Sequence, residues 1–227
     1  MSEMYSVSSA AIDERVSFIR KTYAHLLGAV LAFIGLEVAL FSSGAAGYMA
    51  EAMMSVSWML VLLVFMGVGY AANKFAMKET SPALQYVGLG LYIVAEAVIF
   101  VPLLFVAATF SDPSVIPLAG VTTATVFAGL TVAVFATKKD FSFLRTGLVI
   151  ATFLAMGAIF GSLIFGFSLG LLFSIAMAAL ASGYVLYYTS NVLHHYRPGQ
   201  HVAASLALFS AVAMLFYYIL RIFMSRD

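Results

Sequence analysis

The sequence predicts an all-α membrane protein in which seven helices cross the bilayer. Of its 227 residues, 63% are hydrophobic and only 9% are charged, and the mean hydropathy is +1.05. A soluble domain carries about 25% charged residues, so a soluble core of this length could not absorb so many apolar side chains. The apolar residues also fall in runs of about 20, the length at which an α-helix crosses the hydrocarbon core. Finally, Lys and Arg are concentrated in alternate segments between these apolar runs.

The first three spans are expected at roughly 22–42, 55–73 and 83–108. Two serines and a glycine close the first span, and a charged stretch that ends in Pro82 separates the second from the third. Pro102 lies within the third span, where a proline frees a backbone carbonyl and commonly kinks the helix.

The last four spans are expected at roughly 115–137, 143–164, 168–192 and 203–223. The fourth ends abruptly in Lys138, Lys139 and Asp140. Gly157 and Gly161 form a GxxxG pair in the fifth span, a pattern that predicts close contact with a second helix. The expected domains are therefore a polar cytoplasmic segment at 1–21, disordered over 1–19, a transmembrane domain at 22–223 and a short tail at 224–227.

Positive charge orients these spans. If the N-terminus is cytoplasmic, nine of the eleven Lys and Arg residues lie on the cytoplasmic side, namely Arg15, Arg20, Lys21, Lys74, Lys78, Lys138, Lys139, Arg145 and Arg197. Only Arg221 and Arg226 then lie outside. Cytoplasmic loops carry an excess of Lys and Arg, so this asymmetry predicts a cytoplasmic N-terminus and an external C-terminus. A re-entrant last segment would instead return the tail to the cytoplasm.

Several classes of function find no support in the sequence. The net charge is +1, which argues against nucleic acid as a partner, and the absence of cysteine excludes disulfides and thiolate chemistry. No catalytic motif of a hydrolase or a metalloprotease occurs, so we expect no enzyme and no cofactor. His194, His195 and His201 cluster between the last two spans, but without an acid nearby we interpret them as a solvated loop and expect no metal site.

Two acidic residues fall within spans, Glu37 in the first and Glu96 in the third. A carboxylate in hydrocarbon is costly, so such residues face the bundle interior or a water-filled cavity. Glu37 is close to the outer end of its helix and could be an interfacial carboxylate. Glu96 is at mid-span, where it is either a hydrogen-bonded structural residue or a cation ligand or proton-titratable gate of a pore.

The chain resembles the Bax inhibitor-1 family, also called the transmembrane Bax inhibitor motif family, in its bacterial branch. The segments that carry the resemblance are RKTYAHLLGAVLAF, AEAVIFVPLLF, TTATVFAGLTVAVFATKKDFSFL, GYVLYYTSNVLHHY and LFYYILRIF. It covers nearly all of the chain from Arg20 to Phe223, and the exit TKKDFSFL of the fourth span is its most specific part. It implies seven helices, six of them around a central C-terminal one, in a bacterial plasma (inner) membrane.

The resemblance also implies a passive calcium leak modulated by pH, in which Ca²⁺ is the permeating ion and not a cofactor. Glu96 and Arg221 match family positions, and with Glu37 and Tyr188 they form the predicted ion pathway or gate. The family's gating aspartates correspond to Tyr188 and Ala211, neither of which ionises as a carboxylate, so we expect weak pH dependence.

A second function stays open beside the leak. Some bacterial relatives regulate a membrane-anchored protease, and the polar segment at 1–19 is the part that such a protease could engage. The expected partners are therefore the lipid bilayer and, under this alternative, a membrane-anchored protease in a stress response.

Overall fold

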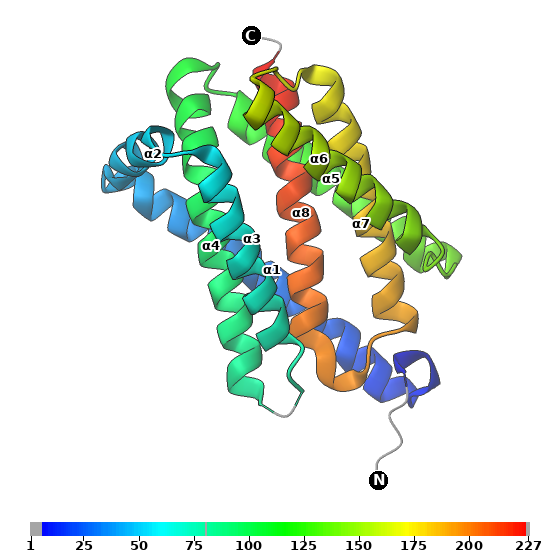
Figure 1. Cartoon of the computed structure of the whole chain (residues 1–227). Helices are drawn as coiled ribbons and strands as arrows, with labels where there is room; N and C mark the ends of the chain where they lie inside the picture. The colour runs from blue at the N-terminus through cyan, green and yellow to red at the C-terminus, as the bar shows by residue number, and fades with distance from the viewer. Residues whose placement is uncertain (1–5, 80, 226–227) are drawn as a thin grey trace.

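A computed structural model describes residues 6–79 and 81–225 (Figure 1). Arg226, one of the two arginines expected on the external side, is not among the described residues. The elements are η1 (Val7–Ser9), α1 (Ile12–Ser42), α2 (Ala45–Ser55), α3 (Trp58–Ala76), α4 (Pro82–Phe110), α5 (Val115–Thr137), α6 (Leu144–Phe165), α7 (Leu171–His194), η2 (Pro198–Gln200) and α8 (His201–Met224). Within this described part, seven helical segments are long and apolar enough to cross a membrane, which confirms the all-α, seven-span prediction.

Helix α1 begins ten residues before the start that hydropathy predicts. Asp13 and Glu14 occupy its first turn, where negative charge is favourable to the helix dipole. Residues 12–19 are therefore helical, and the expectation that they are disordered is wrong. The segment before α1 is also held in place, because the backbone N–H of Val7 donates to the carbonyl of Tyr196 at 2.8 Å.

Helix α2 is an element that the hydropathy pattern does not reveal. Its 11 residues span about 16 Å, too short to cross a hydrocarbon core of about 30 Å. Ala46 and Ala50, one turn apart, are buried against Val101 and Phe105 of α4. The helix therefore lies against the bundle without crossing the membrane.

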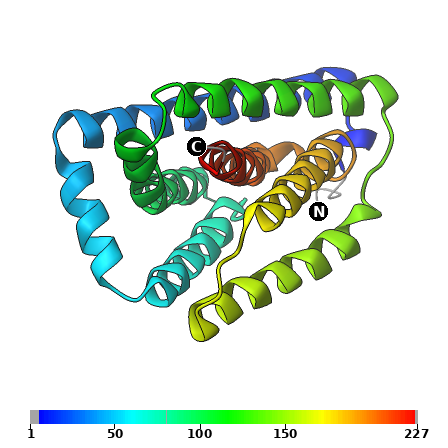
Figure 2. The same cartoon turned by 90° about the horizontal axis from the view of Figure 1, so that it is seen from above.

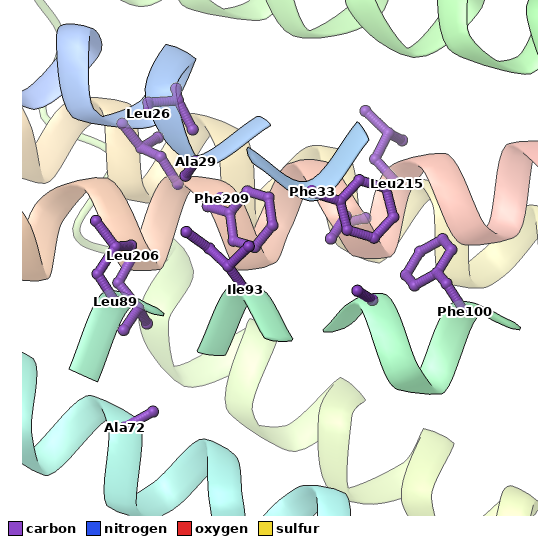
Figure 3. Close-up of a cluster of buried hydrophobic side chains, with 14 of the residues drawn as sticks. Leu26, Ala29, Phe33, Ala72, Leu89, Ile93, Phe100, Leu206, Phe209 and Leu215 are labelled. Carbon is purple, nitrogen blue, oxygen red and sulfur yellow. The ribbon is translucent and has the colours of Figure 1, made fainter. Parts of the chain in front are cut away.

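Helix α8 forms the interior of the bundle, and Figure 2 shows it enclosed by the other long helices. In its most apolar 18-residue window, 72% of the residues are buried, compared with 11% in α3 and in α6. The largest cluster of buried side chains forms where α8 meets α1 and α4; in Figure 3, Phe33, Phe209 and Phe100 come from these three helices. The ring of Phe33 packs edge-on against both other rings, with centroids 5.2 and 6.2 Å apart.

Helices α3 and α4 approach each other closely at Gly88 of α4. A Cβ at Gly88 would lie 2.5 Å from the carbonyl oxygen of Ala72 and 2.7 Å from the nitrogen of Ala76, so only glycine fits there. The GxxxG pair of α6 behaves differently. A Cβ at Gly157 would meet nothing within 4 Å, and one at Gly161 would meet only the ring of Phe167. The predicted close helix contact at this pair is therefore wrong.

Helix α4 carries Glu96 at its centre, 14 residues from each end. Pro82 occupies the first turn, and the Ser81 hydroxyl caps it by accepting from the N–H of Leu84 at 3.4 Å. The helix continues through Pro102 to Phe110. At 1.5 Å per residue, Glu96 is about 21 Å along the helix from either end, which places it at mid-membrane depth.

Candidate functional site

A cavity of about 530 Å³ lies between α3, α4, α6, α7 and α8. Three of the four predicted site residues line it, namely Glu96 of α4, Tyr188 of α7 and Arg221 of α8. Ala211, which the resemblance aligns with a gating aspartate of the family, lines it as well. Most of the remaining lining is apolar. Glu96, which is only 5% exposed, is the single acid among the described residues that line this cavity. The fold thus brings these three residues, distant in sequence, around one space.

The carboxyl of Glu96 has the hydroxyl of Tyr92 as its partner. Tyr92, one helical turn earlier on α4, forms a side-chain hydrogen bond with Glu96 and another with Ser210 of α8. The i, i+4 spacing explains why Tyr92 and Glu96 lie on one face of α4. Glu96 is therefore a partnered carboxyl at the centre of the bundle, joined to α8 through Tyr92.

A second cavity of about 510 Å³ continues the first toward the C-terminal end of α3. It is lined by Gly69, Tyr70, Asn73 and Lys74 of α3 and by the first half of α8. Five residues border both cavities: Phe65, Met66, Tyr92, Tyr188 and Ser210.

The order of lining residues along single helices shows that the two cavities lie end to end. On α3 the first cavity begins at Trp58 and the second ends at Lys74, a distance of about 24 Å along the helix. On α8 the sequence runs from Leu206 in the second cavity to Arg221 in the first. Together they cover most of a hydrocarbon core of about 30 Å, and the border residues form the partition between them.

Tyr188 belongs to a group of tyrosines on this partition. Its ring stacks on Tyr184 with centroids 5.5 Å apart, and the Tyr184 hydroxyl is 2.8 Å from Oγ1 of Thr152 on α6. Aromatic rings thus fill the space around Tyr188, the position that the resemblance aligns with a gating aspartate.

Arg221 is placed in the last turn of α8, where a positive charge is favourable to the helix dipole. Its Nη2 donates to the carbonyl of Leu169, at 3.5 Å, and Tyr217 forms a side-chain hydrogen bond with it. These contacts hold a guanidinium at the mouth of the first cavity, opposite the end that carries Lys74.

Glu37, the fourth predicted site residue, lines a different cavity. This third cavity, of about 690 Å³, lies between α1, α4, α5 and α8, and Glu96, Tyr188 and Arg221 are absent from its lining. Glu37 is 7% exposed, so its side chain is buried within the bundle. The structure therefore separates the two membrane acids into two cavities on different sides of α8.

Sequence reasoning missed the partner of the histidine cluster. Asp140, from the exit of the fourth span, accepts from Nε2 of His195 at 2.9 Å, from the N–H of Ser142 at 2.8 Å and from the Ser190 hydroxyl at 3.4 Å. Asp140 and His195 each follow a span that ends on the predicted cytoplasmic side. That shared side was the sequence signal that could have predicted their contact.

The electrostatics of this loop cluster follow from those bonds. Desolvation acts to raise the pKa of Asp140, but the hydrogen bonds from Ser142 and His195 outweigh it and hold the pKa below its usual value. A lowered carboxyl pKa adds stability above the unfolded pKa, and that stability is lost as the pH falls through the folded pKa. The Asp140–His195 pair is half-exposed, so the effect is small.

Comparison with known proteins identifies the family. The family described as "Inhibitor of apoptosis-promoting Bax1" matches residues 15–227. An uncharacterised protein of Pseudomonas aeruginosa is 28% identical over 97% of this chain and 96% of its own length. Protein lifeguard 4 of Mus musculus is 27% identical over 95% of this chain and 87% of its own, and Bax inhibitor 1 of Schizosaccharomyces pombe is 31% identical over 95% and 79%. With seven apolar helices and a family match over nearly its whole length, the chain is a multi-pass integral membrane protein of the Bax inhibitor-1 family.

Proposed function

We propose that the chain is a passive cation leak that conducts Ca²⁺ through the two cavities that lie end to end. The observation that carries the proposal is the position of Glu96: a buried carboxyl at mid-membrane depth, one turn from the partition between the cavities. Acids within spans typically mark ion pathways, because hydrocarbon tolerates them only where protein or water surrounds them.

The ligands at the partition suit conduction better than storage. Calcium prefers six to eight oxygens, whereas the partition offers the hydroxyls of Tyr92, Tyr188 and Ser210 and the Glu96 carboxyl lies one turn away. A conducting site must bind an ion weakly enough to release it, so a sparse set of oxygens is appropriate. The aromatic rings of the partition lie between the two cavities, so opening of the proposed ion path requires these rings to move.

The test is calcium flux from purified protein in liposomes. We expect Glu96→Gln to lower the flux roughly tenfold, which corresponds to about 1.4 kcal/mol in the barrier. Glu51→Gln is the matched control, because it makes the same chemical change at an exposed position of α2. Unchanged flux in Glu96→Gln, with normal incorporation into liposomes, would remove Glu96 from the pathway and overturn the proposal.

The proposed location is the bacterial plasma membrane, with the N-terminus in the cytoplasm. The charge asymmetry supports this orientation, as does the Lys74 end of the second cavity, which then faces the cytoplasm. Attaching a membrane-impermeant label to single cysteines introduced at Lys78 and at Asp112 tests it. Labelling of the Lys78 site from outside intact cells would reverse the assignment.

The alternative, a regulator that binds a membrane-anchored protease, has weaker support. The segment expected to act as a free tail is held against the α7–α8 connection, where the Ser8 hydroxyl donates to the carbonyl of His194 at 3.1 Å. The leak is therefore the function that we favour.

A further inference from the structure

The third cavity, which opens between α1 and α5, is not part of the proposed ion path, and its lining is different. Within the described part of the chain, its only polar lining side chains are Tyr23, Thr123 and Glu37, and no Lys, Arg or His lines it. The Thr123 hydroxyl is already bonded to the carbonyl of Ala119 at 2.7 Å. Glu37 is thus the one ionisable acid in a cavity that is otherwise almost entirely hydrocarbon.

Helix periodicity points Glu37 inward. The buried residues of α1 recur every three or four positions, at Phe18, Thr22, Leu26, Ala29, Phe33 and Glu37. Its neighbour Val38 is 61% exposed on the lipid-facing side. Both carboxyl oxygens of Glu37 are buried and have no hydrogen-bond partner among the residues that the structure describes. Buried polar groups without partners are rare in folded proteins, because each costs about 1–3 kcal/mol.

The length of the cavity and the position of Glu37 fit a lipid chain whose head group lies at Glu37. Tyr23 and Glu37 are 14 residues apart on α1, so the cavity runs for about 21 Å, somewhat longer than half of a hydrocarbon core of about 30 Å. Glu37 lies only five residues, about 8 Å, before the end of α1 at Ser42. An amphiphile in this position has its head near the interface and its chain toward the membrane centre, the orientation of a lipid in one leaflet.

The cavity is open to the bilayer. Leu27, Ile34 and Val38 line it and are also 59%, 49% and 61% exposed. On the facing side, Gly120 and Ala124 of α5 provide small side chains, and a Cβ at Gly120 would meet nothing within 4 Å. Figure 2 shows α1 and α5 along the same side of α8. A ligand could therefore enter between α1 and α5 from the lipid.

We propose that this cavity binds a single-chain amphiphile with a protonated amine head, whose ammonium group pairs with Glu37 while its hydrocarbon chain fills the space between α1 and α5. A charge-assisted hydrogen bond would satisfy the unpartnered carboxylate, and apolar walls match an alkyl chain. Anionic heads are excluded by repulsion. A lone carboxylate also supplies too few oxygens for a calcium site.

The experiment is equilibrium binding of radiolabelled hexadecylamine to the full chain in phosphatidylcholine nanodiscs. We expect saturable binding of one molecule per chain, with at least tenfold weaker binding of hexadecanol and of palmitate. Glu37→Gln is expected to weaken amine binding at least tenfold by removing the charge. Glu51→Gln, at an exposed site, is the control for loss of an acid.

A second variant tests the cavity without altering its acid. Gly120→Leu places a side chain in the open space and raises helix propensity, so α5 stays folded. It should lower amine binding as strongly as Glu37→Gln, while the melting temperature stays at or above that of the native chain. Equal binding of hexadecanol and hexadecylamine, or amine binding that neither variant weakens, would overturn the proposal.

Discussion

Two acids of the same type, each buried in the membrane, have opposite surroundings on the two sides of α8. Glu96 is 5% exposed and Glu37 is 7% exposed. Glu96 bonds to Tyr92 in a passage with Lys74 at one end and Arg221 at the other. Glu37 has no bonding partner and faces hydrocarbon that opens to lipid. Burial alone therefore does not determine the surroundings of a membrane acid, and the different roles that we propose for these two acids rest on their neighbouring groups.

The largest expected difference between the two sides comes from Gly88→Ala. A Cβ at Gly88 collides with the backbone of α3, so α3 must shift, at a cost of about 1–3 kcal/mol. Helix α3 lines both cavities of the Glu96 passage but not the Glu37 cavity. We therefore expect calcium flux to fall to background while amine binding persists.

Gly129→Ala is the control for this comparison, since a Cβ at Gly129 meets nothing within 4 Å. Flux and amine binding are measured on the same preparations of both variants. Parallel loss of the two activities in Gly88→Ala would show that the two sides are not independent.

An intermediate effect is expected from restoring acids on the Glu96 side. Tyr188 and Ala211 line one cavity, so the double variant Tyr188→Asp with Ala211→Asp introduces two carboxyls that interact. They share a proton in acid and repel each other once both are ionised, so flux should rise with pH. The flux of the native chain, which lacks the pair, should depend less steeply on pH than the flux of the double variant.

Flux across pH in liposomes checks both statements, with each single aspartate variant as the control. A native chain that already switches steeply with pH would point to a different titrating group in the passage.

The smallest effect concerns stability. Glu37→Leu replaces a carboxyl without partners by an apolar side chain, so it should stabilise the fold by about 1–3 kcal/mol. Glu96→Leu should destabilise it, because Tyr92 loses a hydrogen-bond partner. Thermal unfolding of the two variants in one detergent measures the difference. Opposite signs would sharpen the comparison, and equal destabilisation would contradict it.

Hydropathy and charge were sufficient to predict the seven spans, because crossing the bilayer imposes length and composition on each helix. They could not reveal α2, whose contact with α4 depends on two small alanines and not on hydrophobic length. Nor could the start of α1 be predicted, since its first turns are polar and lie before the apolar run.

The acids could be identified from the sequence, but their division between two cavities could not. Each acid stands out as a carboxyl in an apolar run, whereas the space around it depends on how helices pack. Gly88 and Gly157 illustrate this, since the glycine pattern predicted a close helix contact at Gly157, which is open, and gave no signal at Gly88, which is tightly packed. Asp140 and His195, 55 residues apart, became partners only when two loops met.

The position of α8 has a consequence for how the protein is made. The helix that completes the interior emerges from the ribosome after the seven helices that precede it. Until α8 is inserted, α1, α4 and α7 lack the helix surface on which they pack. The nascent bundle is therefore incomplete at that stage. The interior of the bundle is therefore complete only when α8 has docked between helices that were made before it.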